Sequence, residues 1–215
     1  RKIVLPDGLK TISDGTFAFC RALEAVDNIP AGGGDNFVYD NGVFYTKDRK
    51  EIISVVPSAK GDLVVAEGIT TLRNYALAGC IGIKRLVLPT TITNLGNESM
   101  AGCHSLAEIK VLAKQPPKVG KDPLLSSRIN SIILRVPIDT KKTYRGWAGI
   151  PYKNIKEFGS IVTVRNTVRA YGEANPKFGY SVRGEYFEGK PEITCEANEK
   201  SPVGKYDIRI DYGTI

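Results

Sequence analysis

Apolar residues recur along the first half of the chain at fixed but unequal gaps. Six of them fall at offsets 0, 4, 7, 12, 15 and 18 from a starting residue, and the second and third copies of this series are 23 residues apart. An α-helix or coiled coil would need regular gaps of three and four, so the pattern predicts a structural repeat. The three copies are Leu5, Leu9, Ile12, Phe17, Cys20 and Leu23; Val65, Ile69, Leu72, Leu77, Cys80 and Ile83; and Leu88, Ile92, Leu95, Met100, Cys103 and Leu106.

Each copy opens on a segment in which core and outward positions alternate. These segments, residues 3–6, 63–66 and 86–89, are expected to be short strands, and residues 109–112 and 132–136 continue the series. The remaining apolar residues of each copy, four or five apart, suit an irregular or helical return. Because one unit cannot bury its apolar face alone, the copies should stack into a solenoid whose strands form a continuous sheet.

An insertion separates the first copy from the second, since they lie 60 residues apart instead of 23. Within it, residues 37–45 place Asn41-Gly42 between two β-rich runs, which predicts a β-hairpin. Residues 52–57 are expected to return as a further strand of the solenoid. The glycines at 32–34 indicate a flexible entry to the hairpin, because they lack the Lys-Ser/Thr of a phosphate-binding loop.

The series Leu-Pro-x-x-Leu-x-x-Ile, followed by a Cys and a Leu, resembles the BspA-type leucine-rich repeats of bacterial surface proteins. The inserted Asn-Gly-Val-Phe-Tyr-Thr-Lys-Asp, the pair Pro116-Pro117 and the closing residues 136–157 resemble further features of that family. The resemblance covers residues 1–158. It implies a non-catalytic binding surface on the bacterial cell surface or outside the cell. Because the first copy begins at residue 1, earlier repeats or a cap are expected to precede it.

Residues 159–215 have a different pattern of apolar positions and do not continue the repeat. The segments 161–164, 178–182, 192–196 and 206–212 are β-rich and predict a small antiparallel module. Tyr-Gly-x-Ala-Asn-Pro at 171–176 and Ser-Pro-Val-Gly-x-Tyr at 201–206 resemble the YGX-type MBG module of secreted bacterial proteins. The family module normally continues beyond the point that corresponds to Ile215. The resemblance therefore implies a truncated module that serves as a spacer. The fold class expected for the whole chain is mainly β.

The net charge of +7 belongs entirely to the first segment, because residues 159–215 carry eight basic and eight acidic side chains. Residues 110–145 hold nine Lys and Arg against Asp122 and Asp139 only. Such a patch would attract acidic glycans or other anionic polymers, although a solvated face is the favoured interpretation. Nucleic acid is not expected as a partner, because no aromatic residues interleave with the cations. No apolar run approaches the ~20 residues of a membrane helix.

The sequence offers no motif for catalysis. His104 is the single histidine, and the other copies place Arg21 and Ile81 at its position, which predicts a surface residue. A metal site or an activated nucleophile would need further partners. We therefore expect a protein that is not an enzyme and holds no metal and no cofactor.

Cys20, Cys80 and Cys103 occupy the same position in the three copies. Buried cysteines behave as small apolar side chains, so reduced core thiols are the favoured prediction. A Cys80–Cys103 disulfide is the one alternative, because neighbouring strands lie about 4.8 Å apart. Cys195 has no partner in its own module.

Two surfaces are candidates for binding a partner. The first is the outward side of the strand sheet, with the columns Val4, Val64, Val87, Lys110, Arg135 and Lys2, Asp62, Arg85, Glu108, Ile133. From it we select Val64, Arg85, Val87, Lys110 and Arg135, valines that grade into basic residues. The second is the hairpin with Tyr39, Phe44 and Tyr45, for which packing against the solenoid is the favoured alternative.

The sequence thus predicts an adhesin-like surface protein that binds an unidentified protein or glycan, acidic if the basic residues contribute. The alternative is a structural spacer or display segment of a larger surface protein, with no ligand of its own. An exposed apolar patch on the strand side would favour the first function, and a uniformly charged surface the second.

Overall fold

The computed structural model describes residues 1–31, 33–184 and 191–211. It divides into two compact units, Arg1–Glu157 and Phe158–Ile215. Gly32, in the predicted entry to the hairpin, and Tyr212, in the last predicted strand, lie outside the described residues. Each unit is described by itself.

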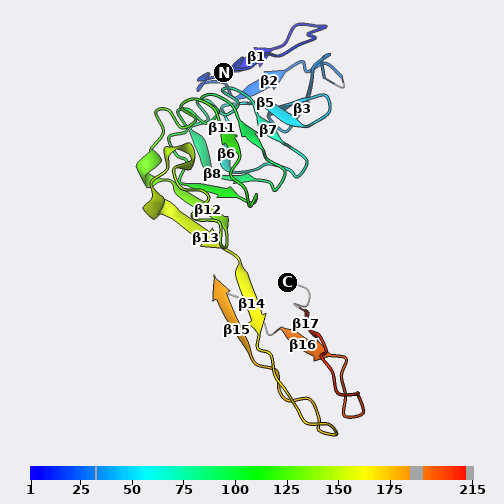
Figure 1. The fold of residues 1–215 in the computed structure, drawn as a ribbon. Helices are drawn as coiled ribbons and strands as arrows, with labels where there is room; N and C mark the ends of the chain where they lie inside the picture. The colour runs from blue at the N-terminus through cyan, green and yellow to red at the C-terminus, as the bar shows by residue number, and fades with distance from the viewer. Residues whose placement is uncertain (32, 185–190, 212–215) are drawn as a thin grey trace. The chain divides into compact units, whose positions relative to one another are not determined.

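The first unit is a β-solenoid in which successive coils contribute one strand each to a shared sheet (Figure 1). Its neighbouring strands pair in parallel, as expected when each coil begins where the previous one did. The strands predicted around residues 63, 86, 109 and 132 are therefore confirmed. In spatial order, the strands of this coil sheet are β13 (Ile155–Phe158), β12 (Ile133–Pro137), β10 (Glu108–Val111), β8 (Gly82–Leu88) and β6 (Lys60–Val64).

The predicted irregular or helical return of each coil contains a second sheet. Its strands in the repeats are two residues long, too short for an alternating pattern to reveal, and the described residues contain 3-10 turns but no α-helix. The inserted hairpin is confirmed and joins this second sheet through β5. In spatial order its strands are β11 (Lys118–Val119), β9 (Asn94–Leu95), β7 (Thr71–Leu72), β5 (Glu51–Val55), β4 (Val43–Thr46) and β3 (Phe37–Asp40).

The first coil departs from the predicted continuous sheet. Strand β1 (Lys2–Val4) pairs only with β2 (Ala25–Asp27), in a two-stranded parallel sheet separate from the coil sheet. The insertion begins directly after β2, so the chain leaves the coil at the point where the next strand would pair. The prediction of one uninterrupted sheet from residue 3 onward is wrong for this reason.

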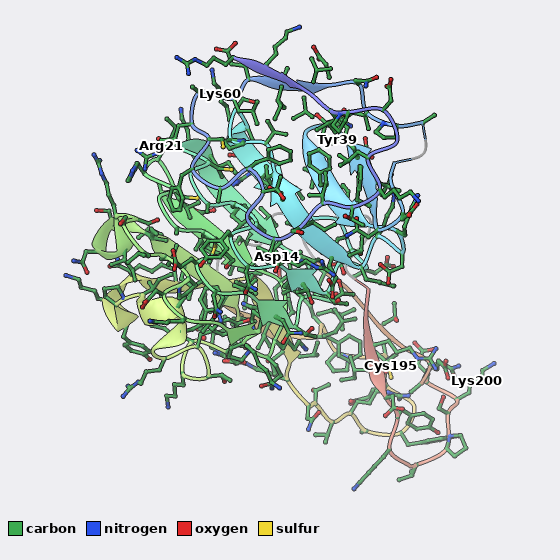
Figure 2. The ribbon with its side chains drawn as sticks, turned by 90° about the horizontal axis from the view of Figure 1, so that it is seen from above. Asp14, Arg21, Tyr39, Lys60, Cys195 and Lys200 are labelled. Atoms are coloured by element: carbon green, nitrogen blue, oxygen red, sulfur yellow. The ribbon has the colours of Figure 1, made fainter. Side chains whose placement is uncertain are left out.

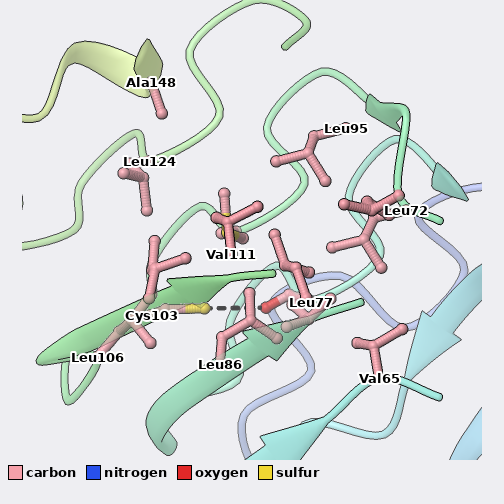
Figure 3. Close-up of a cluster of buried hydrophobic side chains, with 14 of the residues drawn as sticks. Val65, Leu72, Leu77, Leu86, Leu95, Cys103, Leu106, Val111, Leu124 and Ala148 are labelled. Carbon is pink, nitrogen blue, oxygen red and sulfur yellow. Dashed lines mark hydrogen bonds between the residues drawn. The ribbon is translucent and has the colours of Figure 1, made fainter. Parts of the chain in front are cut away.

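Nearly all of the repeated apolar positions form the core. Of the eighteen, only Leu9 and Cys20 are not buried. One cluster runs through the coils from Val43 to Ile155 and includes the side chains in Figure 3. A second joins the first coil to the hairpin through Phe17, Phe37 and Phe44. The residues that repeat along the sequence are thus the residues that pack in the core.

Asparagine side chains connect successive coils. The amide oxygen of Asn74 accepts a hydrogen bond from the backbone N–H of Asn97 at 2.8 Å, and that of Asn97 accepts one from Lys121 at 2.7 Å. Glycines make room for them: a Cβ at Gly96 would lie 2.5 Å from the backbone nitrogen of Asn74, and one at Gly120 2.5 Å from that of Asn97. The coils are therefore held at a fixed spacing here.

The closing segment of the solenoid is fastened by aromatic residues. The hydroxyl of Tyr144 donates to the carbonyl of Ala113 at 2.7 Å, and the indole N–H of Trp147 donates to Pro117 at 2.9 Å. Three 3-10 turns shape this segment: η1 (Ile129–Ser131), η2 (Trp147–Gly149) and η3 (Tyr152–Asn154).

Among its described residues, the second unit contains two antiparallel strand pairs, β14 (Ser160–Val164) with β15 (Tyr180–Gly184) and β16 (Glu192–Cys195) with β17 (Ile208–Asp211). The predicted small antiparallel β module is confirmed, with β15 and β17 each beginning two residues later than expected. Arg169 organises the turn cluster, since its guanidinium donates to the side chain of Asn175 at 2.8 Å and to the carbonyl of Glu173 at 2.6 Å.

Candidate binding surface

The register of the coil sheet brings the predicted outward residues into two straight columns. Across β6, β8, β10 and β12, one column is Val64, Val87, Lys110 and Arg135, and the other is Asp62, Arg85, Glu108 and Ile133. We call these eight positions the strand face. Val4 and Lys2, which the sequence placed in the same columns, lie in the separate β1–β2 sheet and do not extend it.

The strand face offers an apolar corner at β6. Val64 is 65% exposed, and its neighbour Val87 is half-buried. Both valines point away from a core that already holds the alternate residues Leu63, Leu86 and Leu88, the first of them half-buried. Since β6 is an edge strand of its sheet, a partner can reach Val64 both across the outward side of the sheet and past the sheet edge.

Four charged side chains of the strand face, those of Asp62, Arg85, Glu108 and Arg135, form a ladder of alternating sign. Arg85 lies 2.7 Å from the carboxylate of Asp62 and 4.0 Å from that of Glu108, which in turn lies 2.9 Å from Arg135. The arginines are therefore matched by carboxylates. The valine column leads to Lys110 and Arg135, as the sequence predicted, and the valines also border this ladder of paired charges. Each half-exposed pair contributes at most about 1 kcal/mol to stability, so its main effect is on the pattern of charge offered to a partner.

Known families match both units. A family model for the BspA type leucine rich repeat region matches residues 61–144, in six copies. These residues are thus similar to BspA-type leucine-rich repeats. The match includes the second and third copies of the apolar series, whereas the first copy and the hairpin lie outside it. Residues 161–214 match the MBG domain of the YGX type. Both resemblances drawn from the sequence are thus confirmed.

Solved structures of bacterial leucine-rich repeat proteins are also similar. One from Eubacterium ventriosum is 18% identical, with a TM-score of 0.40 over 63% of this chain and 41% of its own. A leucine rich cell surface protein from Faecalibacterium prausnitzii is 11% identical, with a TM-score of 0.43 over 72% and 52%. The pneumococcal vaccine antigen PcpA is 14% identical, with a TM-score of 0.36 over 72% and 53%. This chain thus spans about half of each or less. Among curated proteins none matches it.

The hairpin aromatics belong largely to the core of the first coil. Phe44 is fully buried, with its ring centroid 5.2 Å from that of Phe17 and 4.7 Å from that of Tyr39. Tyr39, among the hairpin strands in Figure 2, is half-buried against the same cluster. Tyr45 is half-buried beside the BspA-type repeats, and burial raises the pKa of its hydroxyl. The packing alternative therefore holds, and the burial corrects the hypothesis that Phe44 offers a binding surface.

Cys80 and Cys103 are buried free thiols inside the BspA-type repeats. The Cys103 thiol donates to the carbonyl of Leu77, in the preceding coil, at 3.3 Å (Figure 3), and that of Cys80 donates to Val55 at 3.8 Å. Burial raises the pKa of Cys103 to about 12 and that of Cys80 further still. Cys20, predicted to be buried in the same position, is exposed, which corrects that prediction for the first copy.

His104 lies at the surface of a repeat turn, as predicted. It is half-exposed, and its Nε2 lies 3.2 Å from the guanidinium of Arg21. Among the described residues no three His, Cys, Asp or Glu side chains gather as metal ligands would. None of the described helices is long and apolar enough to cross a membrane.

The described residues of each unit enclose a hollow. The first, of about 340 Å³, lies at the end of the repeats between Val119, Leu125, Ile129 and Ala148. Asp122 is the one titratable side chain among the described residues that line it. The second, of about 640 Å³, lies within the MBG unit, where Tyr171, Phe178, Cys195 and Tyr206 contribute to its wall.

Proposed function

We propose that this chain is a non-catalytic binding segment of a bacterial surface or secreted protein, and that the strand face contacts the partner, an unidentified protein or glycan. The observation that carries this proposal is the pair of columns on the coil sheet, where exposed Val64 and its neighbour Val87 border the ladder of Asp62, Arg85 and Glu108. An apolar anchor beside patterned charge is the usual composition of a recognition surface.

The repeat architecture supports this role. A solenoid builds a broad, continuous surface from side chains that the core does not need, so partners are contacted across several coils. The resemblance to BspA-type repeats, known from bacterial surface proteins, supports a location on the cell surface or outside the cell. The MBG unit would then act as a spacer.

The test is binding of the full chain to an array of host matrix proteins and glycans, followed by a matched pair of variants. Val64→Asp introduces a charge into the apolar corner of the strand face. Val4→Asp makes the same change in the separate β1–β2 sheet, at a valine of almost equal exposure, 67% against 65%. Both side chains point to solvent, so both variants should fold.

We expect Val64→Asp to weaken binding of the captured partner at least tenfold, as loss of an interface anchor does, while Val4→Asp leaves it unchanged. Equal loss in both variants would contradict a role for the strand face. If the wild-type chain bound nothing on the array, the result would instead favour the alternative function, a spacer or display segment without a ligand of its own.

A further inference from the structure

The net charge of the chain is concentrated at the C-terminal end of the solenoid unit, in the segment that contains β11, β12 and most of β13. Residues 114–157 contain ten Lys and Arg side chains but only three carboxylates, those of Asp122, Asp139 and Glu157. The residues before them, 1–113, carry twelve charges of each sign, and residues 158–215 carry eight of each. The whole net charge of +7 therefore belongs to this segment, which we call the basic end.

Most cations of the basic end are exposed. Only Arg135 and Lys141 are half-buried, and Arg135 is paired with Glu108 outside the segment. With three carboxylates against ten cations, the segment cannot neutralise itself. Its ten basic residues are Lys114, Lys118, Lys121, Arg128, Arg135, Lys141, Lys142, Arg145, Lys153 and Lys156.

Tyr152 brings two of these cations together. The ammonium of Lys141 lies 4.8 Å from its ring centroid and the guanidinium carbon of Arg145 lies 4.7 Å from it. The backbone N–H of Lys141 also donates to the carboxylate of Glu157 at 2.9 Å, which fixes the loop that carries both. Side chains already held on a ring lose less conformational freedom when they bind an anion.

We propose that the basic end binds a sulfated polysaccharide, with Lys141 and Arg145 on the Tyr152 ring, and the exposed Lys142 next to Lys141 in sequence, as its centre. This names a ligand chemistry for the binding role proposed above, on which it rests, but its centre lies outside the strand face, with which the basic end shares only Ile133 and Arg135. Sulfate groups accept charge-assisted hydrogen bonds from ammonium and guanidinium groups, and a linear polyanion can contact several cations along this segment.

Nucleic acid fits this surface less well. Single strands bind by stacking their bases on exposed aromatic rings. Within the basic end, Tyr144 and Trp147 are buried in the core, and Tyr152 is occupied by its two cations. The aromatic platform that bases require is therefore missing from these residues, all of which the structure describes.

The experiment measures binding of the full chain to heparin at several salt concentrations. Wild-type affinity should fall roughly a hundredfold between about 50 and 200 mM salt, as expected when several ion contacts form. Lys142→Glu with Arg145→Glu should lose at least about tenfold. The matched control, Lys10→Glu with Lys60→Glu, changes the net charge equally at exposed sites outside the basic end and should lose less than about twofold. Tyr152→Leu should lose about threefold with its charge unchanged.

Equal losses in the two charge-reversal pairs would overturn the inference, because attraction would then follow net charge alone. So would equal affinity for desulfated heparin, or displacement of heparin by single-stranded DNA at the same concentration. Val64→Asp separates this inference from the proposed function: heparin binding should be unaffected by it. If the chain bound its array partner through Val64 but did not bind heparin, the inference about the basic end would be overturned. The proposed role of the strand face would not be affected.

Discussion

At the scale of single residues, position in the coil determines the chemistry of identical side chains. Cys20, Cys80 and Cys103 share one position in the apolar series, but only the last two are buried. Burial raises the pKa of these two, so at neutral pH almost no reactive thiolate forms.

Thiol labelling tests this difference. In the native protein near pH 8, iodoacetamide should modify Cys20 rapidly, and Cys80 and Cys103 only after unfolding in urea. Mass spectrometry of tryptic peptides after timed labelling gives the rates. Rapid labelling of Cys103 in the native protein would contradict this prediction, because it would show that the reagent reaches the core of the repeats.

Glu67 gives a pH-dependent contribution to stability. Its carboxylate accepts hydrogen bonds from the backbone N–H of Thr90 at 2.8 Å and from the Thr90 hydroxyl at 2.9 Å, and these hold its pKa below the usual value. A pKa lowered by folding means that the contribution is present above the ordinary pKa and is lost as pH falls through the folded value. Glu67→Gln should therefore lower the urea midpoint at pH 7 and lower it less at pH 3. A difference of the same size at both pH values would argue against this account.

At the scale of the element, the strands of the coil sheet were predictable, because the same alternation of core and outward positions recurs in each coil. The alternation around Leu63, Leu86 and Ile109 defined both the strands and the two columns of the strand face. The second sheet was not predictable, since two-residue strands such as Thr71–Leu72 leave no alternation to detect. Nor was the pairing of Arg85 and Arg135 with carboxylates, because side-chain direction across strands is decided by neighbours distant in sequence.

The asparagine connections between coils allow a test of the return segments. A Cβ at Gly120 would lie 2.5 Å from both the backbone nitrogen and the side-chain oxygen of Asn97. Gly120→Ala should therefore cost about 1–3 kcal/mol, as overpacking does. Asn97→Ala should cost about 1 kcal/mol, because it removes one partly exposed hydrogen bond to Lys121. Urea unfolding measures both, and a neutral Gly120→Ala would contradict the close approach of these coils.

At the scale of the whole molecule, the solenoid unit has a core of its own. The core clusters of the solenoid lie entirely within residues 5–155, and the strand pairs of the MBG unit begin at Ser160. A unit with its own core can fold alone. The fragment 1–157 should therefore unfold at the same urea midpoint as the solenoid in the full chain, by circular dichroism. A clearly lower midpoint would mean that the MBG unit stabilises the repeats.

The central claim is that a partner contacts the outward side chains of the coil sheet. Hydroxyl-radical footprinting of the full chain, with and without the tightest partner from the array, tests it most directly, because it reports the solvent access of individual side chains. We predict that Val64 and Val87 lose reactivity on binding while Val4 keeps it. Protection confined to residues outside the strand face, with Val64 unchanged, would contradict the claim.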